Sequence, residues 1–217
     1  MLSDLLKWGG KRPDSSDTAQ AVVAPPRGDE PIVASKAFSK FLSALTSQDS
    51  PVLLDFGPVI GTNVGFFGER LGCKLFIEDL LVDLDRHTRA GTLDALPAAL
   101  ESRFRHGDAS VDGVLCWDFF DFIDKAAAQV LARQIVRMLR PGGAVMAFFC
   151  TSGVPRASYT KYEIVDDTNL RHKYHAGTGG AKRALLNRDI IKMFDGLVVT
   201  DSFLLKNNTR ENLLRRR

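Results

Sequence analysis

The sequence predicts an α/β fold in which helices cover both faces of a doubly wound, mostly parallel sheet. Residues 52–56 form an apolar run that breaks into a turn with glycines at 57 and 61 and then reads as a helix start, as expected where a strand buried on both faces enters a crossover helix. Residues 74–79 form a second short apolar strand that ends in carboxylates. Residues 110–118 form a third, which is followed by an amphipathic helix over 124–139. These strand-to-helix units carry the prediction.

The chain before the first strand is expected to divide into two parts. Residues 1–34 contain a stretch rich in Pro, Ser, Asp and Ala around Pro25-Pro26, and we expect them to be disordered or loosely docked. Residues 35–48 place apolar side chains at helical spacing, which predicts a helix packed on the sheet or over a bound cofactor. The 217 residues, of which 45% are hydrophobic, can bury one sizeable core, so we expect one domain over 35–217.

The remaining elements are predicted from periodicity and turn residues. Residues 104–108, where a further strand belongs, are the least legible part of the chain. A hairpin is expected near 159–175, around a polar turn at 166–169. The other predicted elements are a helix over 62–71, an interrupted helix over 80–100, a strand over 144–149, a helix over 186–194, and an antiparallel strand pair over 197–205 and 211–215.

Together these segments resemble the class I S-adenosylmethionine-dependent methyltransferases. The resemblance rests on Asp55-Phe56-Gly57 through Gly61, on Glu78 after the second strand, on the run Ser-Val-Asp-Gly-Val-Leu at 110–115, on Leu139-Arg140-Pro141-Gly142-Gly143, and on Thr209 through Leu214. It covers about residues 36–217. It implies a Rossmann-like, doubly wound, seven-stranded sheet, mostly parallel with an antiparallel last strand.

The resemblance also implies S-adenosylmethionine as the cofactor. The turn at Gly57 would admit its amino-acid end, and Glu78 would accept hydrogen bonds from both ribose hydroxyls, with Asp79 as the alternative if the strand register shifts by one residue. Asp108 is either the acid that contacts the adenine or part of a turn. The residues expected to bind the cofactor are Asp55, Gly57, Gly61, Asn63, Glu78, Asp108 and Trp117.

Two departures from the family pattern leave a second interpretation open. Val59 stands where the middle glycine of the turn allows close backbone approach, and residues 104–108 run almost directly into the next strand. The chain is therefore either a methyltransferase or a catalytically inactive relative that binds a partner. Val59 also breaks the G-x-G-x-x-G frame of NAD-binding proteins, so NAD is not expected.

Methyl transfer from a sulfonium mainly requires an acceptor held in line with the methyl group, and a base only where the acceptor must lose a proton. Asp118, at the end of a strand, is the first candidate for that base, although an Asp there can also cap the next helix. His172 and His175 in the predicted hairpin are the second candidates. The hairpin is a substrate lid, a dimer contact or an ordinary surface hairpin.

Composition narrows the remaining possibilities. A net charge of +3 is mild and does not predict a nucleic-acid-binding protein, so we expect a small-molecule acceptor ahead of a nucleic acid. Cys73, Cys116 and Cys150 lack metal-ligand spacing, and we expect reduced thiols and no metal. No apolar run is long enough to span a bilayer, so we expect a cytoplasmic protein. Homodimer formation is left open.

Overall fold

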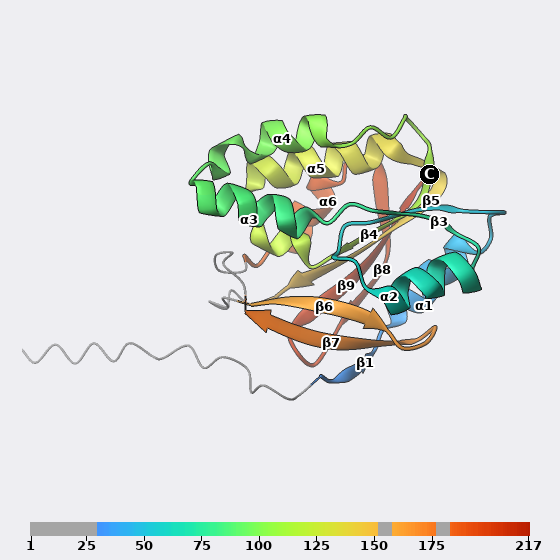
Figure 1. The fold of residues 1–217 in the computed structure, drawn as a ribbon. Coiled ribbons are helices and arrows are strands. Elements are labelled where there is room, and N and C mark those ends of the chain that lie inside the picture. Colours follow the sequence, from blue (N-terminus) through green and yellow to red (C-terminus); the bar gives the residue numbers. More distant parts are fainter. Residues whose placement is uncertain (1–29, 152–157, 177–182) are drawn as a thin grey trace, which may run out of the picture.

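The computed structural model describes residues 30–151, 158–176 and 183–217, so the disorder predicted for the N-terminus falls almost wholly outside the described residues. Two sheets organise this part of the chain (Figure 1). The larger sheet has the order β3-β2-β4-β5-β9-β8, and the smaller one has the order β1-β7-β6. The strands are β1 (Ile32–Ala34), β2 (Val52–Asp55), β3 (Lys74–Ile77), β4 (Val111–Trp117), β5 (Leu139–Cys150), β6 (Ser158–Ile164), β7 (Asn169–Ala176), β8 (Leu197–Leu204) and β9 (Thr209–Arg216).

Six α-helices connect or flank these strands in the described ranges. They are α1 (Lys36–Leu45), α2 (Gly61–Val64), α3 (Leu80–Ala90), α4 (Leu96–Arg103), α5 (Lys125–Met138) and α6 (Asn187–Met193). The helix that begins as α2 continues as a π-helix over Gly65–Arg70, and a 3-10 turn over Phe119–Phe122 precedes α5. None of the described helices is long and apolar enough to cross a membrane.

The central strands are buried on both faces because alternate side chains enter two different cores. Leu54 and Val114 belong to a core shared with α3, α4, α5 and α6, whereas Leu53 and Leu115 belong to a second core shared with α1. The period of two along each strand produces this division. Helices therefore cover both faces of the larger sheet (Figure 1), as the sequence predicts.

The prediction of seven strands is wrong by one, since the larger sheet has six. The missing strand belongs between β3 and β4, but the chain there forms α3 and α4, and Leu96 and Leu100 of α4 are buried in the core shared with α5. Only the segment 104–110 remains before β4 begins, which is too short for a strand and its connection. The last strand, β9, is antiparallel to both of its neighbours.

The strand order creates a switch point between β2 and β4. From β2 the chain passes to β3 on one side, and from β3 it crosses to β4 on the other side, with all three strands parallel. The helices that follow β2 and β4 leave from the same edge of the sheet. Ligands of open α/β sheets bind outside the carboxyl ends of the strands at such a point.

A hairpin made of β6 and β7 covers this edge. The two strands pair antiparallel from Ser158↔Ala176 to Ile164↔Leu170, within the range where the sequence predicts a hairpin. β1 adds a third strand along β7. In Figure 1 the hairpin lies beside α2, and Asn63 of α2 hydrogen-bonds to its backbone. The hairpin is thus inserted into the fold at the place where a ligand would enter.

Candidate functional site

The candidate site is the space between the carboxyl ends of β2 and β4 and the overlying hairpin. It is a cavity of only about 10 Å³, enough for about one water molecule. Its walls include the turn after β2, the residues that end β4, and the inner face of β6. The residues that define it best are Gly57, Asn63, Trp117, Asp118, Thr160 and Tyr162.

Trp117 fills the hollow above the glycine turn. Asp55 and Trp117 face the same side of neighbouring strands, and the indole Nε1 donates a 2.6 Å hydrogen bond to Asp55 Oδ1. The backbone N–H of Gly57 donates to the same oxygen at 2.8 Å. A Cβ on Gly57 would lie 2.8 Å from the indole Cδ1, so the absent Cβ admits the protein's own tryptophan. Packing of Trp117 therefore requires glycine at position 57, and the sequence alone does not show this contact.

Burial disfavours the ionised form of the Asp55 carboxyl group. The side chain is 2% exposed, and burial raises its pKa from 3.8 to about 6, although the hydrogen bonds from Gly57 and Trp117 oppose this shift. The nearby carboxylate of Asp79 adds to the rise. A buried carboxylate that titrates near neutral pH is often part of a functional site.

The backbone of Trp117 is strained. Its φ is +49°, a left-handed conformation that is unfavourable for a bulky residue and costs about 1–3 kcal/mol. The indole is 5% exposed and packs edge-on against Phe148, with ring centroids 6.0 Å apart. Strain of this kind persists only where surrounding contacts fix the side chain.

The hairpin supplies one of the contacts that fix Trp117. Through Tyr162 it also brings Asp118 and His172 close to each other. The ring of Tyr162 stacks on the Trp117 indole with centroids 5.1 Å apart and planes 6° apart, and its hydroxyl hydrogen-bonds with Asp118 and Thr160. Burial raises the pKa of Tyr162 well above its ordinary value, and the charge of Asp118 raises it further. His172 packs edge-on against Tyr162 at 4.9 Å. Asp118 does not cap the following 3-10 turn through its side chain.

His175 and Asn63 lie elsewhere than the sequence predicts. His175 stacks on Tyr159 on the face of the hairpin opposite to Tyr162 and His172, so the structure does not bring it to Asp118. Asn63 Nδ2 donates to the carbonyl of Tyr162 at 2.9 Å, and its Oδ1 accepts from the N–H of Ile164 at 2.8 Å. The amide of Asn63 therefore pairs with the free edge of β6 rather than with a cofactor.

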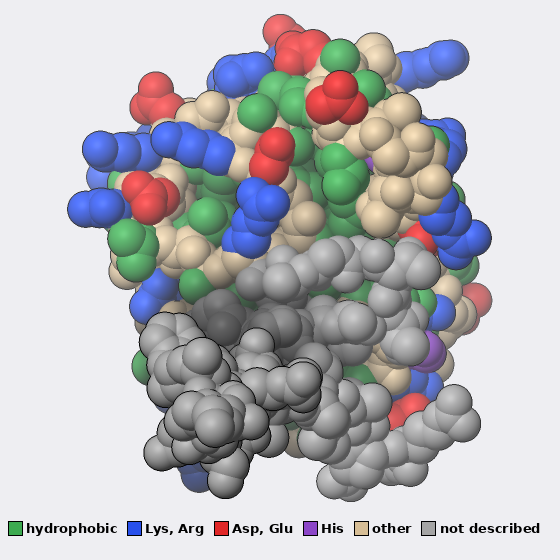
Figure 2. All heavy atoms as spheres, turned by 90° about the vertical axis from the view of Figure 1, so that its left-hand side faces the viewer, with side chains coloured by type: hydrophobic (Ala, Val, Ile, Leu, Met, Phe, Trp, Pro, Cys, Tyr) green, Lys and Arg blue, Asp and Glu red, His purple; other side chains and the backbone are tan. Residues whose placement is uncertain are grey.

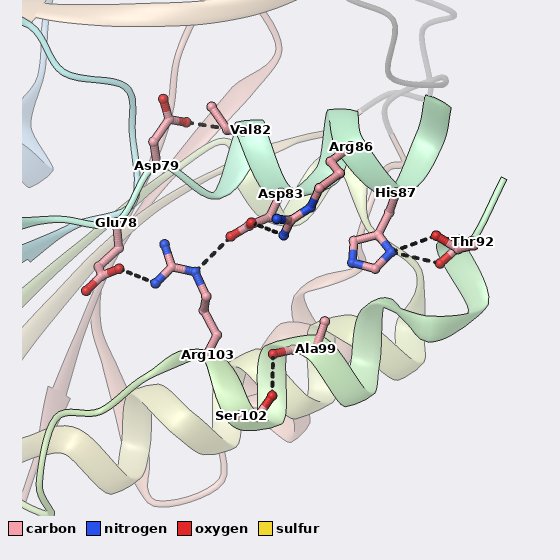
Figure 3. Close-up of polar contacts among 10 residues, drawn as sticks. All are labelled: Glu78, Asp79, Val82, Asp83, Arg86, His87, Thr92, Ala99, Ser102 and Arg103. Atoms are coloured by element: carbon pink, nitrogen blue, oxygen red, sulfur yellow. Dashed lines mark hydrogen bonds and ion pairs between the residues drawn. The ribbon is translucent and has the colours of Figure 1, made fainter. Parts of the chain in front are cut away.

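Glu78 ends β3 as predicted, but its carboxylate is already bound (Figure 3). Arg103 Nη1 donates to Glu78 Oε2 at 2.5 Å, and His106 Nε2 lies 3.3 Å from Oε1. Figure 3 also shows Arg103 reaching Asp83 of α3. The alternative acid, Asp79, caps α3 by accepting from the N–H of Val82. In this conformation both carboxylate oxygens of Glu78 are bound by the protein, whereas Asp79 accepts an N–H through Oδ1.

Asp108 lies at the wrong end of the sheet to contact an adenine. It precedes β4, at the amino end of that strand, whereas the cavity is at the carboxyl ends. Its side chain is 81% exposed and pairs with Arg137. The structure therefore places Asp108 in a turn, away from the cavity. Gly61 begins α2, and a Cβ there would meet nothing within 4 Å.

A larger pocket between α3 and α4 is a weaker candidate. It measures about 420 Å³ and contains Arg86, Arg103 and Asp83, but both guanidinium groups already pair with Asp83 (Figure 3). On the described part of the neighbouring face, Figure 2 shows positive and negative side chains interspersed. Among the described residues, no cluster of His, Cys, Asp or Glu could hold a metal ion, and Cys73, Cys116 and Cys150 form no disulfide there.

No protein-family model and no curated protein sequence matches the chain. Solved structures do match. The CcbJ methyltransferase from Streptomyces caelestis is 16% identical, with 83% of this chain and 94% of that chain covered and a TM-score of 0.48. The Burkholderia thailandensis 1,6-didemethyltoxoflavin-N1-methyltransferase is 17% identical, with 83% and 78% covered and a TM-score of 0.49. The glycopeptide N-methyltransferase MtfA is 12% identical, with 90% and 100% covered and a TM-score of 0.48.

A mostly parallel sheet with helices on both faces and an antiparallel last strand is the architecture that the sequence resemblance implies, one strand short. The chain has a class I methyltransferase-like fold. The TM-scores above are all below 0.5, so the matches decide nothing about this chain's chemistry.

S-adenosylmethionine does not fit the site in this conformation. The Trp117 indole takes the space above Gly57, and a cavity of about 10 Å³ cannot hold the amino-acid end of the cofactor. No methyl-transfer step can therefore be read from this arrangement. Sequence reasoning found Trp117, Asp118 and His172 but assigned no partner to them. It missed Tyr162 as the residue that joins them and Arg103 as the partner of Glu78, because both contacts are made between elements distant in the chain.

Proposed function

We propose that the chain is an S-adenosylmethionine-dependent methyltransferase that acts on a small molecule and binds its cofactor only when the hairpin has moved. The observation that carries this proposal is the convergence of Gly57, Glu78 and Asp118 at the carboxyl ends of three adjacent parallel strands, around a switch point. The pKa of Asp55, raised to about 6 at the same edge, supports a functional site there. A small-molecule acceptor is supported by the mild net charge and by the interspersed charges in Figure 2.

In this proposal each residue of the site has its own role. Gly57 would line the cofactor's amino-acid end, Glu78 its sugar, and Asp118 would hold the proton that some acceptors must lose. Asp118 lies beside Tyr162 in the cavity wall, which is where an acceptor would approach. Glu78 would have to exchange Arg103 for the sugar hydroxyls.

The experiment is calorimetric titration with S-adenosylmethionine and its demethylated product. We expect saturable binding, weakened at least tenfold by Glu78→Ala. Glu69→Ala, which removes an exposed carboxylate of the π-helical turn, is the matched control and should bind as the wild type does. If neither the wild type nor the hairpin variants described below bind at millimolar ligand, the proposal fails. If binding is found, labelled cofactor added to a lysate would identify the methyl acceptor.

The second candidate function is a catalytically inactive, partner-binding relative. A specific observation favours it: three of the groups expected to hold the cofactor are satisfied by the protein itself. Trp117 covers Gly57, while Asp55 bonds to Trp117 and Glu78 bonds to Arg103. The same titration separates the two candidates, because an inactive relative with a permanently filled cavity binds neither ligand.

A further inference from the structure

The hairpin and the end of β4 meet at Tyr162, whose ring stacks on Trp117 and whose hydroxyl hydrogen-bonds with Asp118. We propose that the β6–β7 hairpin is an autoinhibitory latch: Tyr162, by stacking on Trp117, keeps the indole over Gly57, and a ligand enters the site only when this stack opens. The inference rests on the proposed function for the identity of the ligand. The closure itself is argued from contacts within the described residues.

The first step is that the occupied space belongs to the site. Trp117 ends β4. Its indole atoms Cδ1 and Nε1 lie 2.8 Å from the position that a Cβ on Gly57 would take. That position is at the switch point between β2 and β4, where an open α/β sheet receives a ligand. The indole and a ligand at the turn therefore exclude each other.

The second step is that the indole is held there against its own backbone preference. The φ of +49° at Trp117 is strained, and the Tyr162 ring lies parallel to the indole at 5.1 Å. The indole also donates to Asp55. Removal of the Tyr162 ring leaves the strain in place and takes away one face of the packing, so the open conformation becomes more populated.

The third step concerns how the hairpin is attached. Its inner-face side chains Tyr162, Ile164 and Leu170 are buried in the core shared with α1, and its free edge is held by a few hydrogen bonds. Asn63 makes two hydrogen bonds to the backbone of β6, at Tyr162 and Ile164. Thr62 and Arg70 add contacts to Glu163 and Asp167, both of which are exposed contacts. When the free edge of the hairpin lifts, the backbone groups released from Asn63 and the hydroxyl released from Asp118 can bond to water.

The variants that test the latch are Tyr162→Leu, which removes the stack, and Asn63→Ala, which removes the edge hydrogen bonds. Tyr159→Leu is the matched control, because Tyr159 lies on the same strand but stacks on His175, on the face opposite to Tyr162. Each variant is made in the full chain with Trp8→Phe, so that Trp117 is the only tryptophan. Acrylamide quenching reports the exposure of Trp117, and calorimetry reports the affinity for S-adenosylmethionine.

We expect quenching of Trp117 to rise at least twofold in Tyr162→Leu and Asn63→Ala, and their affinity for S-adenosylmethionine to rise at least tenfold, because apparent affinity scales with the open fraction. Tyr159→Leu should match the parent within twofold in both measurements. If one variant fails to fold, the other carries the test.

Two results overturn the latch: unchanged quenching in both variants, or measurable binding with the same affinity in the variants and the parent. Increased quenching without binding in any protein supports the latch as a moving part and overturns the proposed function. The two failures are therefore distinguishable.

Discussion

The free energy of unfolding should fall as pH rises because Asp55 ionises, and replacement of Asp55 by Asn should remove most of that fall. The pKa of Asp55 is about 6 in the folded chain, against an ordinary value of 3.8. Between these two pH values the folded state binds the proton more tightly than the unfolded state, so the free energy of unfolding falls as pH rises. Each pKa unit is worth about 1.4 kcal/mol, and the difference therefore amounts to about 3 kcal/mol, lost by about pH 7.

The assay is urea unfolding of the wild type and Asp55→Asn at intervals from pH 4 to pH 7.5. An Asn side chain retains an oxygen for the N–H groups of Trp117 and Gly57 but cannot ionise. We expect the variant to gain on the wild type by about 3 kcal/mol between pH 4 and pH 7. Asp94→Asn, which removes an exposed charge, should give no comparable change. A difference between Asp55→Asn and the wild type that stays constant across this range would refute the reasoning.

Three further predictions concern urea unfolding at neutral pH. Asp112→Ala should lower the free energy of unfolding by about 3 kcal/mol, since Asp112 is buried and bonded to Arg140 and the N–H of Val52; the exposed ion pair lost in Asp108→Ala should cost less than about 1 kcal/mol. Gly57→Ala should cost about 1–3 kcal/mol because its Cβ meets the indole, whereas Gly61→Ala should stay within about 0.5 kcal/mol. Trp117→Gly should be about 1 kcal/mol more stable than Trp117→Ala, since only glycine relieves the positive φ; equal stability would contradict the strain.

The sequence predicts the frame of this protein well because its strands are buried on both faces. The strands predicted over 52–56, 74–79 and 110–118 coincide with β2, β3 and β4 to within two residues at each end, and their acids fall at or directly after strand ends as expected. The strand count fails at 104–108, where the legible signal is an unusually short connection. The seventh strand is expected only from the family resemblance, and the segment before β4 is too short to form it.

The site is harder to predict, because its state depends on which side chains meet across the fold. Trp117 and Tyr162 are 45 positions apart in sequence, and Glu78 and Arg103 are 25 apart. No local periodicity encodes a ring stack or an ion pair between separate elements. A sequence motif can thus place a glycine turn at the right edge of the sheet, and cannot say whether a ligand or a tryptophan lies on it.

The two candidate functions differ in one quantity, the free energy that holds the hairpin closed. A closing free energy of about 3 kcal/mol would weaken the apparent affinity for a ligand about 150-fold, which leaves a micromolar site measurable. At about 6 kcal/mol the same site would bind nothing at cellular concentrations, and the chain would behave as an inactive relative. The strained backbone of Trp117 works against closure by about 1–3 kcal/mol, and the Tyr162 stack and the Asn63 hydrogen bonds work for it. The burial of Tyr162, Ile164 and Leu170 also favours closure. Substitutions at Tyr162 or Asn63 remove part of the closing free energy and are expected to move the chain from the inactive behaviour toward the ligand-binding one.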